Sequence, residues 1–178
     1  GIFLSNFTNL IPKSLKKYIK TDDIKKSDLH EFHLLTAEST FLVRESSKIN
    51  LLQDVDKHGV RIAVAERSAY DLWLTENIKN AELIRAKSID LSFKIFEDNS
   101  YEVLAGLKPR LIDDLKNTKN CKILPGAFTF IKQCIGSKPG NPEAEKFINN
   151  FIDRNIKNGF IESLLLKYNV LGKLSVPA

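Results

Sequence analysis

The stretch RIAVAERSAYD, residues 61–71, carries the strongest structural signal in this sequence. Its first five residues, Arg61 to Ala65, form a compact apolar run after Gly59 and predict a buried strand. Ser68 and Asp71 follow at capping-box spacing, so their side chains can satisfy the first free amides of a helix. The stretch therefore predicts a strand that leads directly into a capped helix.

The same order of elements recurs twice downstream. Residues 82–86 predict a second strand, and Ser88 is placed to cap the helix that follows it. Residues 101–105 predict a third strand, after which Pro109 opens a third helix. Strands that alternate with helices of this length indicate parallel βαβ units, so the predicted fold class is α/β.

Further elements are expected on both sides of this repeat. Residues 40–44 are rich in strand formers, and Gly136 to Pro142 predicts a loop. The other expected elements are strands at 121–124 and 127–135 separated by a Pro125-Gly126 turn, helices at 13–20, 143–157 and 160–168, and a tail at 170–178.

Composition excludes several classes of protein. The 178 residues are 43% hydrophobic, which excludes intrinsic disorder, and no apolar run approaches the ~18 residues of a transmembrane helix. The net charge is +5, and the densest basic run, Lys13 to Lys26, is interleaved with Asp residues. A solvated helical face is favoured there, so no nucleic-acid partner is expected. The Gly1 start and the absence of methionine predict a processed or truncated chain with no visible signal peptide.

Metal and redox motifs are also missing. Cys121 and Cys134 have neither CxxC nor zinc-site spacing; two buried thiols are expected, with a disulfide as the alternative in an oxidising compartment. His30 and His33 could share a helical face, but no further ligands accompany them. We therefore expect neither a metal nor another cofactor.

Two strand ends are the candidate sites. The turn Glu66-Arg67-Ser68-Ala69-Tyr70 joins a strand to a capped helix start, where free amides and the helix dipole favour a carboxylate or phosphate. The alternative is that Ser68 only caps its own helix. Gly106-Leu107-Lys108 is a second loop at a strand end, where Lys108 could complement an acidic ligand or simply be solvated.

No catalytic template is recognisable. The sequence has no GxSxG elbow, no GxxxxGK[ST] loop and no GxGxxG fingerprint. Asp113 and Asp114 are adjacent, so on a helix they diverge and make a poor acid/base pair. We therefore expect a ligand cleft, no catalytic residues and no enzymatic activity.

The order of these motifs resembles the family 3 extracellular solute-binding proteins, which are type 2 periplasmic binding proteins and the ligand-capturing components of ABC transporters. The resemblance covers roughly residues 40 to 170. It rests on TFLVRESSKI at 40–49, GVRIAV at 59–64, SAYDL at 68–72, VLAGLKP at 103–109, LPGAF at 124–128 and IKQCIG at 131–136, followed by KPG at 138–140.

The resemblance implies a type 2 periplasmic-binding-protein-like α/β fold with one complete Rossmann-like lobe, a parallel sheet flanked by helices. Residues 45–130 would form this lobe 2, and residues 1–44 and 131–178 a partial lobe 1 in which residues 1–39 match poorly. It further implies a ligand bound by Glu66 to Tyr70 and Gly106 to Lys108, with Arg44 and Gln133 on the crossing strands.

The implied function is capture of a small polar, carboxylate-bearing solute for an ABC importer. The partners would be this ligand and the membrane permease, and the protein would be a periplasmic or extracellular monomer. In amino-acid binders of the family an Asp usually stands where this chain has Leu107, which puts a standard α-amino acid in doubt.

Three alternatives stay open. The same fold can serve as a sensor or regulatory ligand-binding module. It can also carry a dehydratase-like enzyme for a small carboxylated substrate, for which Glu66 and Lys108 are the nearby acid/base candidates. A degenerate chain that binds nothing is the third.

Overall fold

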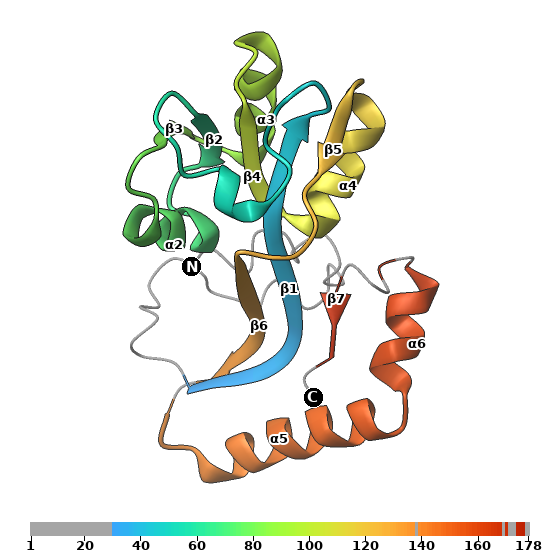
Figure 1. Cartoon of the computed structure of the whole chain (residues 1–178). Coiled ribbons are helices and arrows are strands. Elements are labelled where there is room, and N and C mark those ends of the chain that lie inside the picture. Colours follow the sequence, from blue (N-terminus) through green and yellow to red (C-terminus); the bar gives the residue numbers. More distant parts are fainter. Residues whose placement is uncertain (1–29, 138, 169, 171–173, 177–178) are drawn as a thin grey trace. The chain divides into compact units, whose positions relative to one another are not determined.

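A computed structural model describes residues 30–137, 139–168, 170 and 174–176 of the chain (Figure 1). The helix predicted at 13–20 and the basic run at 13–26 lie outside these residues. The chain divides into two compact units. Unit 2 comprises residues 36–131 and 170–175, and unit 1 comprises residues 1–35, 132–169 and 176–178. The division into lobes made from the sequence stays a prediction, and residues 36–44, grouped there with lobe 1, belong to unit 2.

The α/β sheet of unit 2 is built around three parallel strands. β2 pairs in parallel with β3 from Arg61↔Glu82 to Ala65↔Ala86, and with β4 at Ile62↔Val103 and Ala63↔Leu104. The path of the sheet is β3-β2-β4-β1-β5. The strands are β1 His30–Arg44, β2 Arg61–Ala65, β3 Glu82–Ala86, β4 Val103–Leu107 and β5 Cys121–Ile123. The predicted parallel βαβ units are therefore confirmed, with β4 shifted two residues from its predicted position.

Helices connect these strands as the repeat predicted. The Ser68 and Ser88 hydroxyls cap α2 and α3, and Pro109 lies in the first turn of α4. The helices of unit 2 are α2 Ala69–Asn77, α3 Ile89–Asp98 and α4 Lys108–Asn117, with a 3-10 turn, η2, at Leu52–Asp54. Two large apolar residues of these helices, Leu72 and Leu91, are exposed.

The first strand differs most from the prediction. β1 begins at His30, ten positions before the predicted strand at 40–44, and it runs antiparallel to β4, with Ser39 opposite Leu107 and Val43 opposite Val103. Its residues 39–43 are all buried. Phe41 and Val43 pack in a hydrophobic cluster on one face of the sheet and Leu42 in a second cluster on the other, which explains why both faces of this segment are excluded from water.

Two hydrophobic clusters, both in unit 2, cover the two faces of the sheet. One joins α2, through Leu74 and Tyr70, to strand residues that include Phe41, Val64 and Ala105. The other joins Phe96 of α3 and Leu111 of α4 to strand residues on the opposite face. Because side chains alternate along each strand, neighbouring residues such as Ala63 and Val64 enter different clusters.

The later strands flank β1. The Pro125-Gly126 turn predicted between two strands is present, and Gly126 has a φ of 83°, which a side chain would strain. β6 (Thr129–Ser137) pairs with β1, and so does β7 (Leu174–Ser175), which lies in the segment predicted to be a tail. Cys121 is a buried free thiol on β5, whereas Cys134 is half-buried on β6.

Unit 1 contains the helices α5 (Pro142–Lys157) and α6 (Phe160–Lys167), close to the predicted bounds. Asn141 caps α5 by accepting a hydrogen bond from the Ala144 amide, and Gly159, with a φ of 73°, separates the two helices. None of the helices in the described residues is long and apolar enough to cross a membrane.

Candidate functional site

The turn from β2 into α2 has a left-handed residue at its centre. β2 ends at the buried Ala65, and the side chains of Glu66 and Arg67 that follow it are exposed. Arg67 has a φ of 60°, which turns the chain so that Ser68 becomes the N-cap of α2. An L-residue pays a strain energy in this region, so the surrounding contacts must hold Arg67 there.

The Ser68 hydroxyl is fully used inside the turn. Its Oγ donates to the Ala65 carbonyl oxygen at 2.8 Å and accepts from the Asp71 amide at 3.1 Å. A hydroxyl has one proton, so in this arrangement Ser68 has none left for an anion. Ser68 therefore orders the turn, and any anion must be bound by other donors.

The Asp71 carboxylate holds the left-handed residue. Its Oδ2 accepts a hydrogen bond from the Arg67 amide at 2.7 Å, one residue before the Ser68 amide that a capping box would use. The Ser68 amide instead donates to the Ala65 carbonyl oxygen at 3.3 Å. Asp71 is 4% exposed, so this is a buried carboxylate at the start of a helix.

Arg85 on β3 supplies the charge that pairs with Asp71. Its Nε lies 2.9 Å from Asp71 Oδ1, and its Nη2 donates to Thr75 Oγ1 at 2.7 Å. Thr75 in turn donates to the Asp71 carbonyl oxygen at 2.7 Å. Arg85 is not among the residues predicted from the sequence, although a charged residue inside a short apolar strand is a signal that points to it.

Two amides remain as anion donors at this turn. Within the described part of the chain, the amides of Ala69 and Tyr70 make no hydrogen bond, because the first helical amides have no intrahelical partner. The exposed Arg67 side chain lies beside them in sequence.

Burial raises the pKa of Tyr70 above its ordinary value of 10.0, against smaller opposing effects of the Ser68 hydroxyl and the Arg110 charge. The Tyr70 hydroxyl is thus neutral at physiological pH.

The second predicted site, Gly106 to Lys108, is no loop. β4 runs to Leu107 and α4 begins at Lys108, with nothing between them. Gly106 leaves room for Leu111, since a Cβ on residue 106 would lie 3.0 Å from a Leu111 methyl carbon. The structure does bring this strand end and the turn after β2 to one edge, because β2 and β4 are parallel neighbours.

Lys108 already has an acidic partner within the chain. Its ammonium lies 2.5 Å from Glu38 Oε2, and both side chains are about one third exposed. Glu38 precedes Ser39, which faces Leu107 across the antiparallel pair, and this register brings the two charges together. An anionic ligand near Lys108 therefore has to compete with Glu38.

Arg44 lies at the opposite end of the sheet from these residues. β1 is antiparallel to β4, so the end of β1 adjoins the start of β4, and Arg44 itself pairs with Cys121. The guanidinium is engaged there: it donates to the Phe96 carbonyl oxygen at 3.0 Å and pairs with Glu97 at 3.0 Å. We therefore leave Arg44 out of the proposed site.

Gln133 is half-buried on β6 and belongs to unit 1. Its place in a ligand site stays a prediction.

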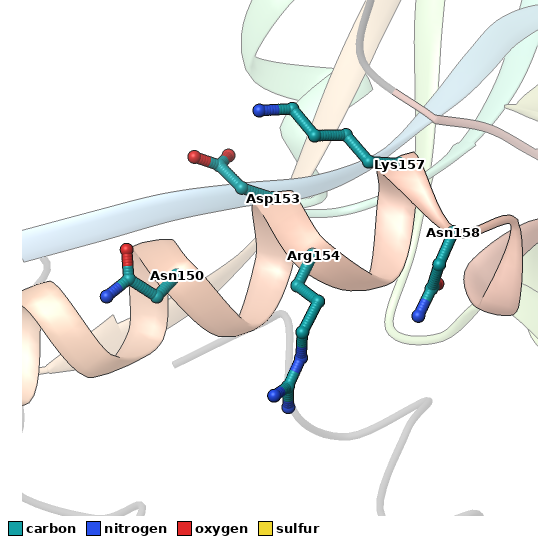
Figure 2. A pocket seen from close by; sticks show the side chains of 5 residues that line it. All are labelled: Asn150, Asp153, Arg154, Lys157 and Asn158. Carbon is teal, nitrogen blue, oxygen red and sulfur yellow. The ribbon is translucent and has the colours of Figure 1, made fainter.

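An open hollow on α5 is lined by none of the predicted residues. The residues around it are Asn150, Asp153, Arg154, Lys157 and Asn158, all from one helix and its C-cap. Figure 2 shows Arg154 pointing away from Asp153 and Lys157, so the side chains do not converge on a ligand. The hollow is the flank of a helix and a poor candidate for a site.

The histidines do not form a metal site. His30 and His33 lie on β1 rather than on a helix, and a separation of three places them on opposite faces of a strand. His30 Nδ1 lies 3.2 Å from Glu145 Oε1. No group of three or more His, Cys, Asp or Glu side chains that could hold a metal exists in the described residues.

With this geometry established, the fold can be assigned to a class: the chain has, in part, the α/β fold of the substrate-binding proteins of amino acid ABC transporters. No protein-family model matches the sequence, and no curated protein does. The likeness is therefore one of structure.

Three solved structures illustrate the match. An ancestral amino-acid-binding protein, a precursor of cyclohexadienyl dehydratase, is 19% identical with a TM-score of 0.65 over 83% of this chain. A mutant of ArgBP from T. maritima is 17% identical with a TM-score of 0.66 over 90% of this chain. A solute receptor for L-cysteine of Neisseria gonorrhoeae is 13% identical with a TM-score of 0.66 over 83% of this chain.

The chain is short relative to these proteins. It spans 64% of the ancestral protein, 73% of the ArgBP structure and 60% of the cysteine receptor. The fold it shares with them is therefore partial.

Proposed function

We propose that this chain is a solute-binding protein that holds the carboxylate of a small polar ligand at the turn between β2 and α2. The observation that carries the proposal is the pair of unbonded amides, Ala69 and Tyr70, at the start of a helix that follows a parallel strand. Ligands of open α/β sheets bind at such strand ends, and helix N-termini favour anions. The fold shared with amino-acid-binding proteins supports the same conclusion.

Each residue of the turn has a part in this proposal. The amides of Ala69 and Tyr70 donate to the ligand carboxylate, and the exposed Arg67 guanidinium adds a charge-assisted bond. Glu66, also exposed, is available for a cationic group of the ligand. At the end of β4, Gly106 and Leu107 form the adjoining wall, beside the ion pair of Lys108 with Glu38.

The ligand class follows from these charges. The solved structures with this fold include an ancestral arginine-binding protein bound to glutamine and a solute receptor for L-cysteine, so an amino acid is one candidate. Leu107 offers no acid for an α-ammonium group, and Glu38 is neutralised by Lys108, which favours an organic acid instead. The proposed partners are this ligand and the permease of an ABC importer, with the protein outside the cytoplasm.

Transport binding is preferred to catalysis, although one similar structure is a precursor of a dehydratase. A dehydratase needs a group that transfers protons, and Lys108, one of two candidates, is held in an ion pair with Glu38. Glu66, the other candidate, is exposed, and no hydrogen bond or ion pair among the described residues involves its side chain.

Thermal unfolding in L-arginine, L-glutamine, L-cysteine or succinate tests the proposal. A ligand present at 100 times its Kd stabilises the folded chain by about 2.7 kcal/mol, so we expect one of these compounds to raise Tm by roughly 5 to 10 °C. The corresponding carboxamide, which lacks the negative charge, should give no shift. No shift with any of the four would reject the proposed function.

A pair of double variants tests the place of binding. Arg67→Ala with Ser68→Ala should abolish the shift. The matched control is Lys87→Ala with Ser88→Ala, because Lys87 and Ser88 likewise place a cation and a capping serine before α3. An equal loss in both double variants would place the carboxylate elsewhere.

A further inference from the structure

We propose that Arg85 is a positioning residue of the anion site: by neutralising Asp71, it makes the start of α2 attractive to a carboxylate. This inference rests on the proposed function. It concerns a residue that touches no ligand and acts through Asp71.

Asp71 puts a negative charge next to the amides that would bind the anion, so a cation is needed to neutralise it. The Asp71 carboxylate is buried in the first turn of α2, with its Oδ2 at 2.7 Å from the Arg67 amide. Its negative charge therefore lies within the same turn as the Ala69 and Tyr70 amides. An unpaired charge there would cancel the favourable field of the helix dipole and repel a second anion.

Arg85 is held in a fixed orientation by two contacts. Its Nε lies 2.9 Å from Asp71 Oδ1, and its Nη2 donates to Thr75 Oγ1 at 2.7 Å. The β2 and β3 register sets Arg85 opposite Val64, one step before the end of β2. The cation is thereby placed beside the turn and toward α2.

If Arg85 had only a structural role, its loss would lower stability and leave the affinity for anions unchanged. The Asp71 side chain is 5% exposed and that of Arg85 is 39% exposed, so removal of Arg85 leaves a buried carboxylate unpaired and should lower the stability of the fold. The Arg67 amide, the contact that holds the left-handed turn, does not depend on Arg85. Loss of Arg85 should therefore lower Tm and, unlike the loss of a purely structural ion pair, also weaken the binding of anions.

The experiment measures Kd by titration calorimetry with L-arginine, L-glutamine, L-cysteine and succinate, alongside Tm. We expect Arg85→Gln to weaken whichever of these compounds binds the parent by about tenfold, the effect of one unpaired charge in the turn. Arg85→Lys keeps the charge and should stay within about threefold of the parent. Adding Asp71→Asn to Arg85→Gln removes the unpaired charge and should recover most of the lost affinity.

Arg61→Gln is the matched control. Arg61 also forms an ion pair with a carboxylate, Glu102, but at the start of β2 and thus at the opposite edge of the sheet. Arg61→Gln should lower Tm without weakening the binding of any of the four compounds.

Three outcomes decide the matter. Equal Kd values for Arg85→Gln and the parent would overturn the inference and leave the proposed function intact. A double variant as weak as Arg85→Gln would also overturn it, because neutralisation would then not be the role of Arg85. If the parent binds none of the four compounds, both the function and the inference fail.

Discussion

Arg67 is one of three non-glycine residues with left-handed backbone in the described part of the chain, together with Ser100 and Asn120. Glycine occupies this region without steric cost, so Arg67→Gly should raise the free energy of unfolding by roughly 0.5 to 1 kcal/mol. Urea denaturation measures the change. Ser100→Gly is the control, because Ser100 has a similar φ but lies away from the turn after β2. A lower stability of Arg67→Gly would show that the Arg67 side chain makes contacts worth more than the strain.

Ser39 and Thr40 are neighbouring, fully buried residues whose hydroxyls differ in bonding. The Thr40 hydroxyl donates to the Leu124 carbonyl oxygen at 3.2 Å, whereas the Ser39 hydroxyl has no partner among the described residues. A buried polar group without a hydrogen bond costs about 1 to 3 kcal/mol. Ser39→Ala should therefore raise the free energy of unfolding by about 1 kcal/mol, and Thr40→Val should lower it. A loss of stability in both variants would indicate a bound water at Ser39.

The ion pair of Glu102 with Arg61 should account for part of the loss of stability at acidic pH. It accepts hydrogen bonds from the Arg61 amide, Nε and Nη2, and the Arg61 side chain is the main cause that holds the Glu102 pKa below its ordinary 4.5. The unfolded chain then binds the proton more tightly than the folded chain does. The stability from this pair is present above pH 4.5 and is lost as the pH falls through the lower folded-state pKa.

Glu102→Gln should therefore flatten the fall in stability below about pH 4.5, as measured by urea denaturation across pH. Arg61→Gln should flatten it as well, since it removes the two side-chain hydrogen bonds and the positive charge, although the bond from the backbone amide stays. An acid dependence as steep as that of the parent in both variants would contradict the assignment.

At the scale of elements, the two serine caps of unit 2 should differ in strength. Ser88 Oγ accepts from the Leu91 amide at 3.1 Å and is exposed, so Ser88→Ala should cost about 1 kcal/mol. Ser68 is buried and also donates to the Ala65 carbonyl oxygen, so Ser68→Ala leaves the Asp71 amide without its partner and removes one of two hydrogen bonds to that carbonyl. We expect the Ser68→Ala loss, measured by urea denaturation, to be about 2 kcal/mol. Equal losses would show that water replaces the hydroxyl at Ala65.

The elements that the sequence predicted well are those with local signals. β2, β3 and the helix caps follow from short apolar runs and capping serines, which act within a few residues. The extension of β1 back to His30 depends on pairing with other strands, among them β7, whose two residues carry no strand signal of their own. Such pairing has no counterpart in local sequence.

The candidate site likewise combines features with a local sequence signal and features that depend on strand pairing. The turn at Arg67 and Ser68 is local and could be predicted. The pairs Lys108 with Glu38 and Arg85 with Asp71 join residues 70 and 14 positions apart, so only the strand order and register reveal them. Arg44 could not be placed from the sequence because its position depends on the antiparallel direction of β1.

At the scale of the whole molecule, the two units should differ in their ability to fold alone. Both hydrophobic clusters consist of residues between 41 and 128, within unit 2. A segment of residues 36–131 contains β2 to β5, most of β1 and all three helices that cover the sheet. We expect this segment to fold cooperatively, with an m-value in urea of at least about 1 kcal/mol per M. Its stability should be below that of the full chain, because β7 no longer pairs with Thr36 and Ala37.

The complementary segment, residues 132–169, is the control. Its described part keeps α5 and α6, and helices of this length are marginal without a partner to pack against. Circular dichroism should show a cooperative urea transition for 36–131 and a broad, weak one for 132–169. The turn after β2 and its Asp71 and Arg85 pair lie wholly within the first segment, so Arg85→Gln should weaken carboxylate binding by this segment as it does in the full chain. An unfolded 36–131 segment would mean that the two clusters are insufficient without the rest of the chain.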